Sequence, residues 1–185
     1  YIYARSRAAT ITLPGLNPNF SEDGQLIVSS SSNQDMSYIY DRSSGIITEL
    51  PGLVPKFSED GQRIGTSSEN QDKSYVYDRS SGTITEIEGL EPKFSEDDKW
   101  ITTELQGERI TQLYDTSGTL LAQFPGVDPA FIPNSNELIT YINEDTYRIW
   151  EIDNGLDDLI AKGCTWLEDY FRTYPEEHLK VCDQV

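Results

Sequence analysis

The chain has 185 residues, with 32 Asp and Glu against 14 Lys and Arg, which gives a formal charge of −18 at pH 7. This length fits one domain or a part of a larger one. Aromatic residues make up 11% of the sequence, too many for a disordered acidic chain. Such a negative surface repels phosphate groups, so the composition argues against nucleic-acid and anionic-membrane partners. A single His also excludes any mechanism that needs two imidazoles.

No apolar run reaches the length of about 20 residues that a membrane span requires, and nothing resembles a signal peptide. The two cysteines, Cys164 and Cys182, do not form a disulfide-rich framework, and whether they pair is left open. Their small number favours a cytoplasmic location. Because the first residue is Tyr1 and not Met, we expect a processed or truncated part of a longer protein.

A 37-residue repeat organises most of the chain. Residues 14–50 and 51–87 are identical at 27 of 37 positions without a gap. The chain begins inside a repeat, since Tyr1-Ile2-Tyr3 matches Tyr38-Ile39-Tyr40 at the same spacing. We therefore expect an array over residues 1–153 and a tail over residues 154–185. The array divides into a half unit at 1–13, full repeats at 14–50, 51–87 and 88–124, and an incomplete repeat at 125–153.

Each repeat has the pattern of four short strands. In the first repeat these are residues 17–20, 25–30, 37–41 and 46–50, separated by turns and by a polar loop at 31–36. Four strands in 37 residues with no helix between them predict one four-stranded antiparallel blade, and hence an all-β fold of the β-propeller class. A β-helical solenoid is the alternative, but its coils are usually shorter. Tyr positions that recur in register are expected to form the core between blades: Tyr3, Tyr40, Tyr77 and Tyr114.

Two motifs in the repeats resemble the WD-repeat family. Residues 57–62, Phe-Ser-Glu-Asp-Gly-Gln, resemble its strand–turn signature, with Glu59 where Pro is commoner. Residues 113–124 resemble its aromatic–acid ending and the hairpin that follows, with Tyr114 in the place of Trp. The family's Gly-His pair is absent, so the network that this His anchors cannot form and the resemblance implies divergent blades. TolB-like propellers, which have a related turn, are a second resemblance.

The tail changes to helical spacing. Residues 156–172 place apolar side chains on one stripe, Asn154 can cap the helix, and Pro175 can open a second short helix. These features predict a helical hairpin that closes one flank of the propeller. Residues 155–171 also resemble a segment that follows WD-repeats in many cyanobacterial proteins. That resemblance implies the C-terminal part of a larger protein, often a STAND-type signalling ATPase, although no Walker loop is present in this chain.

The sequence offers little for catalysis, metals or cofactors. Acidic turns such as Glu22-Asp23 invite calcium, but solvated acids are routine in turns and no calcium-loop spacing is present. His178, Cys164 and Cys182 do not make a zinc site by themselves, and a packed Cys164 is the simpler interpretation. A carboxylate-dependent hydrolase needs two acids in different environments, whereas these repeats are nearly copies. We therefore expect no catalytic, cofactor or metal residues.

Differences between the repeats point to a binding face instead. The hairpin turn Asp-Arg-Ser-Ser-Gly is identical at residues 41–45 and 78–82, while the loops that enter the inner strands and the 31–36 type loops vary. In a propeller these two loop sets share one face, which is the usual binding face. The candidate partner-binding residues are Asn17, Asn19, Ser32, Asp35, Val54, Lys56, Glu69, Asp72, Glu91, Lys93, Gln106 and Asp128.

We expect a non-enzymatic module of a larger signalling protein that presents these loops to a protein or peptide. The alternative is a structural module that oligomerises through open blade edges. A third interpretation, a carboxylate-dependent hydrolase, is less favoured. The number of blades is a separate question: strand 10–13 could close a four-bladed ring, or the chain is an arc of a larger one, which we prefer.

Overall fold

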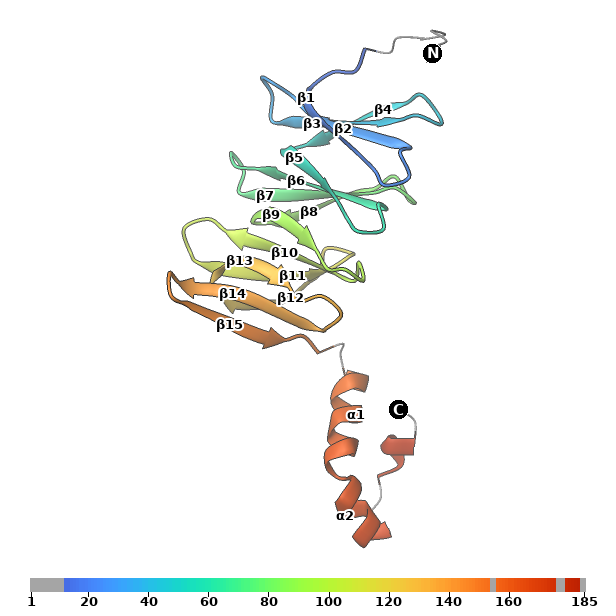
Figure 1. Ribbon diagram of the computed structural model, residues 1–185, viewed down its shortest axis with the longest axis vertical. Coiled ribbons are helices and arrows are strands. Elements are labelled where there is room, and N and C mark those ends of the chain that lie inside the picture. Colours follow the sequence, from blue (N-terminus) through green and yellow to red (C-terminus); the bar gives the residue numbers. More distant parts are fainter. Residues whose placement is uncertain (1–11, 154–155, 176–178, 184–185) are drawn as a thin grey trace, which may run out of the picture.

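The computed structural model describes residues 12–153, 156–175 and 179–183. Figure 1 shows four antiparallel sheets stacked in chain order, followed by a short helical tail that extends away from them. The all-β class, the blades and the C-terminal helical pair are therefore confirmed. The half unit 1–13 lies outside the described residues up to residue 11, and so do Asn154, His178 and part of the segment after Pro175.

Each sheet follows the chain from one strand to the next. Blade 1 contains β1 (Leu16–Phe20), β2 (Leu26–Ser30), β3 (Met36–Asp41) and β4 (Ile47–Pro51). Blade 2 contains β5 (Leu53–Phe57), β6 (Arg63–Ser68), β7 (Lys73–Asp78) and β8 (Ile84–Glu88). Blade 3 contains β9 (Leu90–Phe94), β10 (Trp100–Leu105), β11 (Ile110–Asp115) and β12 (Leu120–Pro125). Blade 4 has three strands, β13 (Val127–Phe131), β14 (Glu137–Asn143) and β15 (Thr146–Glu151).

Short polar turns set the register within each blade. In the third-to-fourth-strand hairpin of blade 2, Asp78 Oδ1 accepts the backbone N–H groups of Ser80 (2.9 Å) and Ser81 (3.0 Å). Gly82 follows with φ +70°, a conformation that residues with a Cβ adopt at a cost. These bonds hold the pKa of Asp78 below its ordinary value, with the Ser80 hydroxyl as the largest cause. The identical turn in blade 1 has the same arrangement around Asp41.

The core lies between the blades and not within them. Leu26, Val28, Ile39 and Leu50 of blade 1 pack against Ile64 and Tyr75 of blade 2, and similar clusters join the later blades. The expectation that recurring tyrosines form this core is confirmed for Tyr40 and Tyr114, which are buried, and Tyr77 packs at its margin. Tyr3 lies outside the described residues. Blades 2 and 3 therefore bury both of their faces, and blades 1 and 4 bury one face each.

Buried hydroxyl groups tie each blade to the linker that enters it. Thr103 Oγ1 donates to the Glu88 carbonyl at 2.7 Å, and Thr140 Oγ1 donates to the Pro125 carbonyl at 2.7 Å. On the preceding blade, Ser74 Oγ donates to the Gly89 carbonyl at 2.8 Å. Buried carbonyl groups need hydrogen-bond partners. These Ser and Thr hydroxyl groups provide them, which explains why each blade keeps a polar residue at these buried positions.

The stack is an open arc. Blades 1 and 4 lie at its opposite ends in Figure 1, so the four-bladed ring is not the arrangement observed. At the first end, Leu16 and Phe20 are 55% and 59% exposed, although their equivalents in later blades are more covered. At the other end, Tyr147 and Ile149 are 58% and 49% exposed. Both ends thus present apolar faces of the kind that are buried elsewhere in the arc.

The tail differs in detail from the expected hairpin. Helix α1 (Leu156–Trp166) is followed directly by α2 (Glu168–Thr173), with a break at Leu167, and the chain then returns to a 3₁₀ turn at Lys180–Asp183. Lys162 anchors α1 to the end of blade 4 through Glu151 and Asp153, at 2.6 and 2.7 Å. Figure 1 shows the two helices extending away from the blades, so they do not close a flank of the stack.

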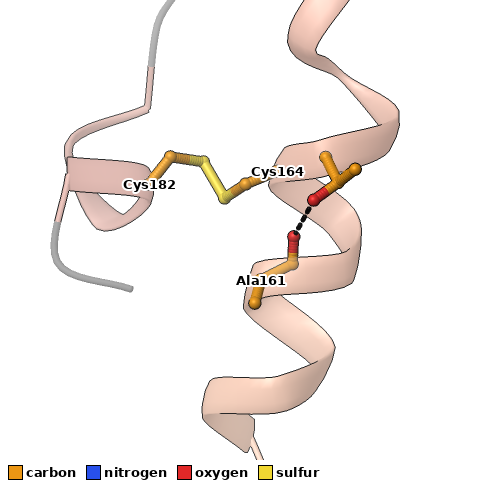
Figure 2. Close-up of a disulfide and its surroundings, with 4 residues drawn as sticks. Ala161, Cys164 and Cys182 are labelled. Atoms are coloured by element: carbon orange, nitrogen blue, oxygen red, sulfur yellow. Dashed lines mark hydrogen bonds between the residues drawn. A yellow bond between two sulfur atoms is a disulfide. The ribbon is translucent and has the colours of Figure 1, made fainter.

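A disulfide fixes this return. Figure 2 shows Cys164 of α1 joined to Cys182 of the 3₁₀ turn, and the structure corrects the interpretation of Cys164 as a simply packed thiol. The tail is too small to bury a core of its own, and Phe171 is its one buried large side chain among those described. The covalent link therefore replaces packing there, a constraint that residue types alone did not reveal.

One turn carries an unfavourable charge. We expect Asp98→Asn to stabilise the protein at pH 7 by about 0.5 kcal/mol in urea unfolding. Burial raises the pKa of the Asp98 carboxyl, and the nearby Asp60 carboxylate adds to this shift. A carboxyl whose folded pKa is raised contributes stability below its unfolded pKa and loses it as the pH rises through the folded value. Asn removes the charge, can still accept the Asp60 N–H (2.9 Å) and tolerates φ +56°.

Asp97→Asn is the matched control, because the adjacent carboxyl shifts the other way. Burial opposes its charge, but hydrogen bonds from Lys99 and Ser95 prevail and lower the pKa of Asp97 below 3.8. Its stabilising contribution is present above that value and is lost as the pH falls. This variant should be destabilised at pH 7 and approach the parent at low pH. The same sign for both variants at pH 7 would contradict the explanation.

Candidate functional site

The loops that were expected to share a face do lie together. The linker that enters each blade is hydrogen-bonded to the second-to-third-strand loop of the blade before it. Gly52 N–H donates to the Asp35 carbonyl (3.0 Å), Gly89 N–H to the Asp72 carbonyl (3.0 Å), and Gly126 N–H to the Arg109 carbonyl (2.8 Å). The two loop sets therefore form one continuous edge of the arc, which we call the loop face.

Four of the candidate residues share an unusual backbone conformation at this face. Asn17, Val54, Glu91 and Asp128 have φ between +50° and +55°, and each lies in a first strand where the pairing register shifts. Three of them have their N–H capped by the preceding blade, from Val54 to Ser30 Oγ (3.1 Å), Glu91 to Ser67 Oγ (2.8 Å) and Asp128 to Glu104 Oε1 (3.0 Å). The bulge turns their side chains to solvent, while the cap makes their backbone part of the blade junction.

The second candidate position on the first strands contains Asn19, Lys56 and Lys93. Asn19 Oδ1 accepts the neighbouring Phe20 N–H at 2.9 Å, and Lys56 is exposed. Lys93 joins blades 3 and 4, because its Nζ contacts Asp128 Oδ1 at 2.6 Å and the Pro129 carbonyl at 2.9 Å. Lys93 therefore has a structural partner, unlike the free loop position that the sequence suggested.

The loop positions separate into exposed and structural ones. Ser32, Glu69 and Gln106 are exposed at the rim of the loop face. Asp35 is only half-buried, and its carboxylate accepts the Ser68 hydroxyl of blade 2. Asp72 occupies the equivalent place with φ +54°, and its Oδ1 is buried without a hydrogen-bond partner. The exposed three are thus better candidates for contact with a partner than the two aspartates.

Two residues of the loop face were missed by the sequence analysis. Glu104 stands where the earlier blades have Ser30 and Ser67, and burial raises the pKa of its carboxyl, with the Asp128 N–H bond acting in the opposite direction. Arg109 stands where they have Asp35 and Asp72, and its Nη2 donates to the Ile142 carbonyl at 2.8 Å. Comparing each repeat column for a change of residue type would have found both.

The loop face is therefore most distinctive between blades 3 and 4. Lys93 contacts Asp128 there, and the charges of Lys93, Glu91 and Asp128 all act on the Glu104 carboxyl, so the junction combines three acids and one base. Glu104 is half-buried, and a carboxyl in such a place can accept a hydrogen bond from a polar group of a partner. Within the described residues, no three His, Cys, Asp or Glu side chains group as metal ligands do.

A hollow lies along the first strands of blades 2 to 4 and extends to the turns at the edge opposite the loop face. It has a volume of about 450 Å³ and is lined by Phe57, Phe94 and Phe131, which recur at 37-residue intervals, and by Lys93. The hollow is open, and Glu59 and Glu96 line it as well as Lys93, so aromatic rings and charges of both signs meet there. Such a mixed lining suits a peptide side chain better than a small polar substrate.

Comparisons with known proteins bear on the fold. No protein-family model and no curated protein matches this chain. Among solved structures it is similar to Kluyveromyces lactis Hsv2, with a TM-score of 0.60 and 15% identity over 80% of this chain and 53% of that one. It is also similar to the β-propeller domain of Myceliophteria thermophila Cps50 (Swd1), with a TM-score of 0.50 and 11% identity over 74% and 53% of the two chains. The fold is a β-propeller.

A third similar structure is a putative 6-phosphogluconolactonase from Bacteroides uniformis, with a TM-score of 0.51 and 16% identity over 74% of this chain and 50% of that one. At such identities the likeness concerns the propeller fold alone, because one propeller architecture hosts unrelated functions. This propeller spans about half the length of the structures it matches. No described helix has the length and apolar character to cross a membrane, and the longest, α1, has 11 residues.

Proposed function

We propose that this propeller arc is a non-catalytic interaction or ligand-sensing module that presents its loop face to a protein or peptide. One observation carries the proposal: exposed, varying side chains from successive blades meet on one edge, above a frame that repeats almost unchanged. The exposed set is Asn17, Asn19, Ser32, Val54, Lys56, Glu69, Glu91, Gln106 and Asp128. Rigid blades that present variable loops are a common basis for recognition.

The resemblance of the repeats and tail extends this proposal. We infer a divergent WD-repeat propeller from the C-terminal part of a larger cyanobacterial-type signalling protein, of which STAND-type ATPases are frequent examples. The surface charge supports a protein or peptide partner over a nucleic acid or an anionic membrane, because −18 disfavours phosphate groups. In such a protein the propeller would bind the partner, and the other domains of the larger protein would respond to that binding.

Charge-matched variants test the loop face. We expect the double variant Glu69→Gln with Glu91→Gln to weaken binding of peptides selected from a random phage-displayed library against this chain. The loss should be about tenfold, which corresponds to about 1.4 kcal/mol. The control variant, Glu22→Gln with Glu49→Gln, removes the same charge from an exposed turn and from the exposed outer strand β4, away from the loop face. Equal losses in both variants, measured by titration calorimetry, would contradict a specific loop face.

A cytoplasmic location is part of the proposal and has its own test. Disulfides are rare in the reducing cytosol, so Cys164 and Cys182 would be thiols there and the tail would be untied. Alkylation of cells at the moment of lysis, followed by mass spectrometry, counts the free thiols. Two alkylated cysteines support the cytoplasm, and an intact disulfide places the chain in an oxidising compartment.

The second candidate function is assembly. The apolar faces at both ends of the arc favour it, because isolated soluble domains seldom expose large contiguous apolar patches. A carboxylate-dependent hydrolase is less favoured, and Glu104 at the junction of blades 3 and 4 is where it would have to operate. Turnover of ester or glycoside substrates that disappears in Glu104→Gln would support the hydrolase and contradict the non-catalytic proposal.

A further inference from the structure

Blade 4 lacks the outermost strand that the other blades have. In blades 1 to 3 the third strand is paired on both sides, whereas β15 pairs with β14 alone among the described strands. The side chains of β15 are exposed along most of its length. An edge of this kind presents unpaired N–H and C=O groups and accepts another extended segment.

A cavity marks the place of the missing strand. It has a volume of about 600 Å³ and lies between β12 and the end of blade 4, with Ala122, Phe124 and Ile152 in its lining. At the preceding junction the equivalents of Ala122 and Phe124 are Thr85 and Ile87. Those two are covered by the hairpin of the next blade, because a Cβ added at Gly118 would lie 2.5 Å from Thr85 Cγ2 and 3.3 Å from Ile87 Cγ2. The cavity is thus the space that a fourth strand and its hairpin would fill.

The other end of the chain carries a segment with the sequence of a fourth strand. Residues 10–15, Thr-Ile-Thr-Leu-Pro-Gly, align with residues 47–52, Ile-Thr-Glu-Leu-Pro-Gly, which form β4 and the linker to blade 2. Blade 1 already has four strands, and residues 12–14 belong to none of the described sheets. Residues 12–15 lead into β1, and blade 1 and β15 lie at opposite ends of the arc, so these residues do not reach β15 of the same copy (Figure 1).

We propose that residues 10–13 of one copy add to β15 of a second copy and complete its fourth blade. This inference concerns a different surface from the loop face and gives a specific form to the second candidate function, assembly. The register follows from blade 1, where Tyr38 pairs with Glu49 and Ile39 pairs with Thr48. By the same offsets Arg148 of the second copy pairs with Thr12 of the first copy, and Ile149 of the second copy pairs with Ile11 of the first.

This pairing would cover both open ends of the arc at once. Leu13 corresponds to Leu50, which is fully buried beside Ile39, so Leu13 would shield the exposed Ile149 in the same way. Pro14-Gly15 then leads directly into blade 1, whose Leu16 and Phe20 would stack on blade 4 as a fifth blade does in a continuous arc. The Ser29 hydroxyl already donates to the Pro14 carbonyl at 2.7 Å, as its equivalents do at each junction. Such a head-to-tail contact closes into a ring or grows as a chain of copies.

The new junction is not a copy of the other three. Tyr141 and Tyr147, with ring centroids 6.3 Å apart, stand where blade 1 has Ser30 and Ser37. In blade 1 the hydroxyl groups of these two serines hold the linker to the next blade, through Val54 N–H (3.1 Å) and the Gly52 carbonyl (2.8 Å). The linker of the first copy would pass over aromatic rings of the second copy instead, so strand pairing and apolar contact are what must hold this junction.

Mass measurement is the first test. Light scattering across a concentration series should give at least twice the single-chain mass of 20.9 kDa. Removal of residues 1–13 should return the mass to that of one chain, and so should an excess of a synthetic peptide that spans residues 8–14. A single-chain mass at all concentrations would overturn the proposal. So would an assembly that is unchanged by the deletion, because it would use another surface.

Cross-linking tests the register. Two variants, Thr12→Cys and Arg148→Cys, are mixed under mild oxidation, and a covalent dimer should form only in the mixture. The control mixture replaces Arg148→Cys by Thr146→Cys, which lies two residues along the same strand and should cross-link at least tenfold less. Equal yields would contradict the register. Peptide binding at the loop face should be unaffected by removal of residues 1–13, so this proposal and the proposed function fail separately.

Discussion

Gly89→Ala should destabilise the protein by about 3 kcal/mol or more in urea unfolding, although it adds one methyl group. The residue has φ +85°, which costs an alanine about 1–2 kcal/mol. The added Cβ would lie 2.7 Å from Thr103 Oγ1 and 2.8 Å from the Glu104 carbonyl oxygen, and a backbone atom cannot move aside cheaply. The glycine also has both of its backbone polar groups bonded, to Asp72 and Ser74. Any shift would therefore break the hydrogen bonds that hold this linker to blade 2.

Gly82→Ala separates these two contributions. Gly82 also has positive φ, +70°, but a Cβ there would meet no atom within 4 Å. This variant should lose only the conformational cost, about 1 kcal/mol. A loss at Gly82 equal to that at Gly89 would show that backbone conformation alone explains the recurrence of glycine in the linkers. The additional loss of stability that we expect in Gly89→Ala measures the cost of the close approach of adjacent blades at Gly89.

The repeat made the fold readable from the sequence. Because the pattern recurs at 37-residue intervals, each position of the repeat is seen in several copies. The alternation of side chains between the two faces of a strand around Tyr40 therefore recurs around Tyr114. The stacking order then follows from chain order, because each blade can bury its faces only against its neighbours. Single features were harder to predict. The break at Leu167 and the disulfide between Cys164 and Cys182 occur once each, and they depend on distances that sequence spacing does not contain.

The loop face was predicted as a region but not residue by residue. Its variable columns were visible, and the structure places them on one edge. A comparison of the repeats does not show which of these side chains already have partners within the arc. In the aligned repeats Lys93 and Asp35 look no different from Lys56 and Glu69. The side chains of Lys93 and Asp35 nevertheless form hydrogen bonds across a blade junction. Such partners come from the next repeat, so they depend on the angle between blades.

Trp100→Ala should have the other large effect, a loss of about 3–5 kcal/mol. Trp100 is 6% exposed and belongs to the cluster that joins blade 3 to Leu138 and Ile152 of blade 4. Its ring stacks with that of Phe131, with centroids 6.5 Å apart. Trp166→Ala is the control, because Trp166 is 89% exposed and its removal should leave the unfolding midpoint unchanged.

The loss at Trp100 should also be local. Blade 4 has a single neighbour in the arc and only three strands, so this one cluster supplies most of the packing that holds it. In a stack where each unit contacts only its neighbours, weakening one junction detaches what lies beyond it before the remainder unfolds. Hydrogen exchange in Trp100→Ala should therefore accelerate in β13, β14 and β15 far more than in β5 to β8. Uniform acceleration would instead mean that the arc unfolds as one cooperative unit, with its stability shared among all three junctions.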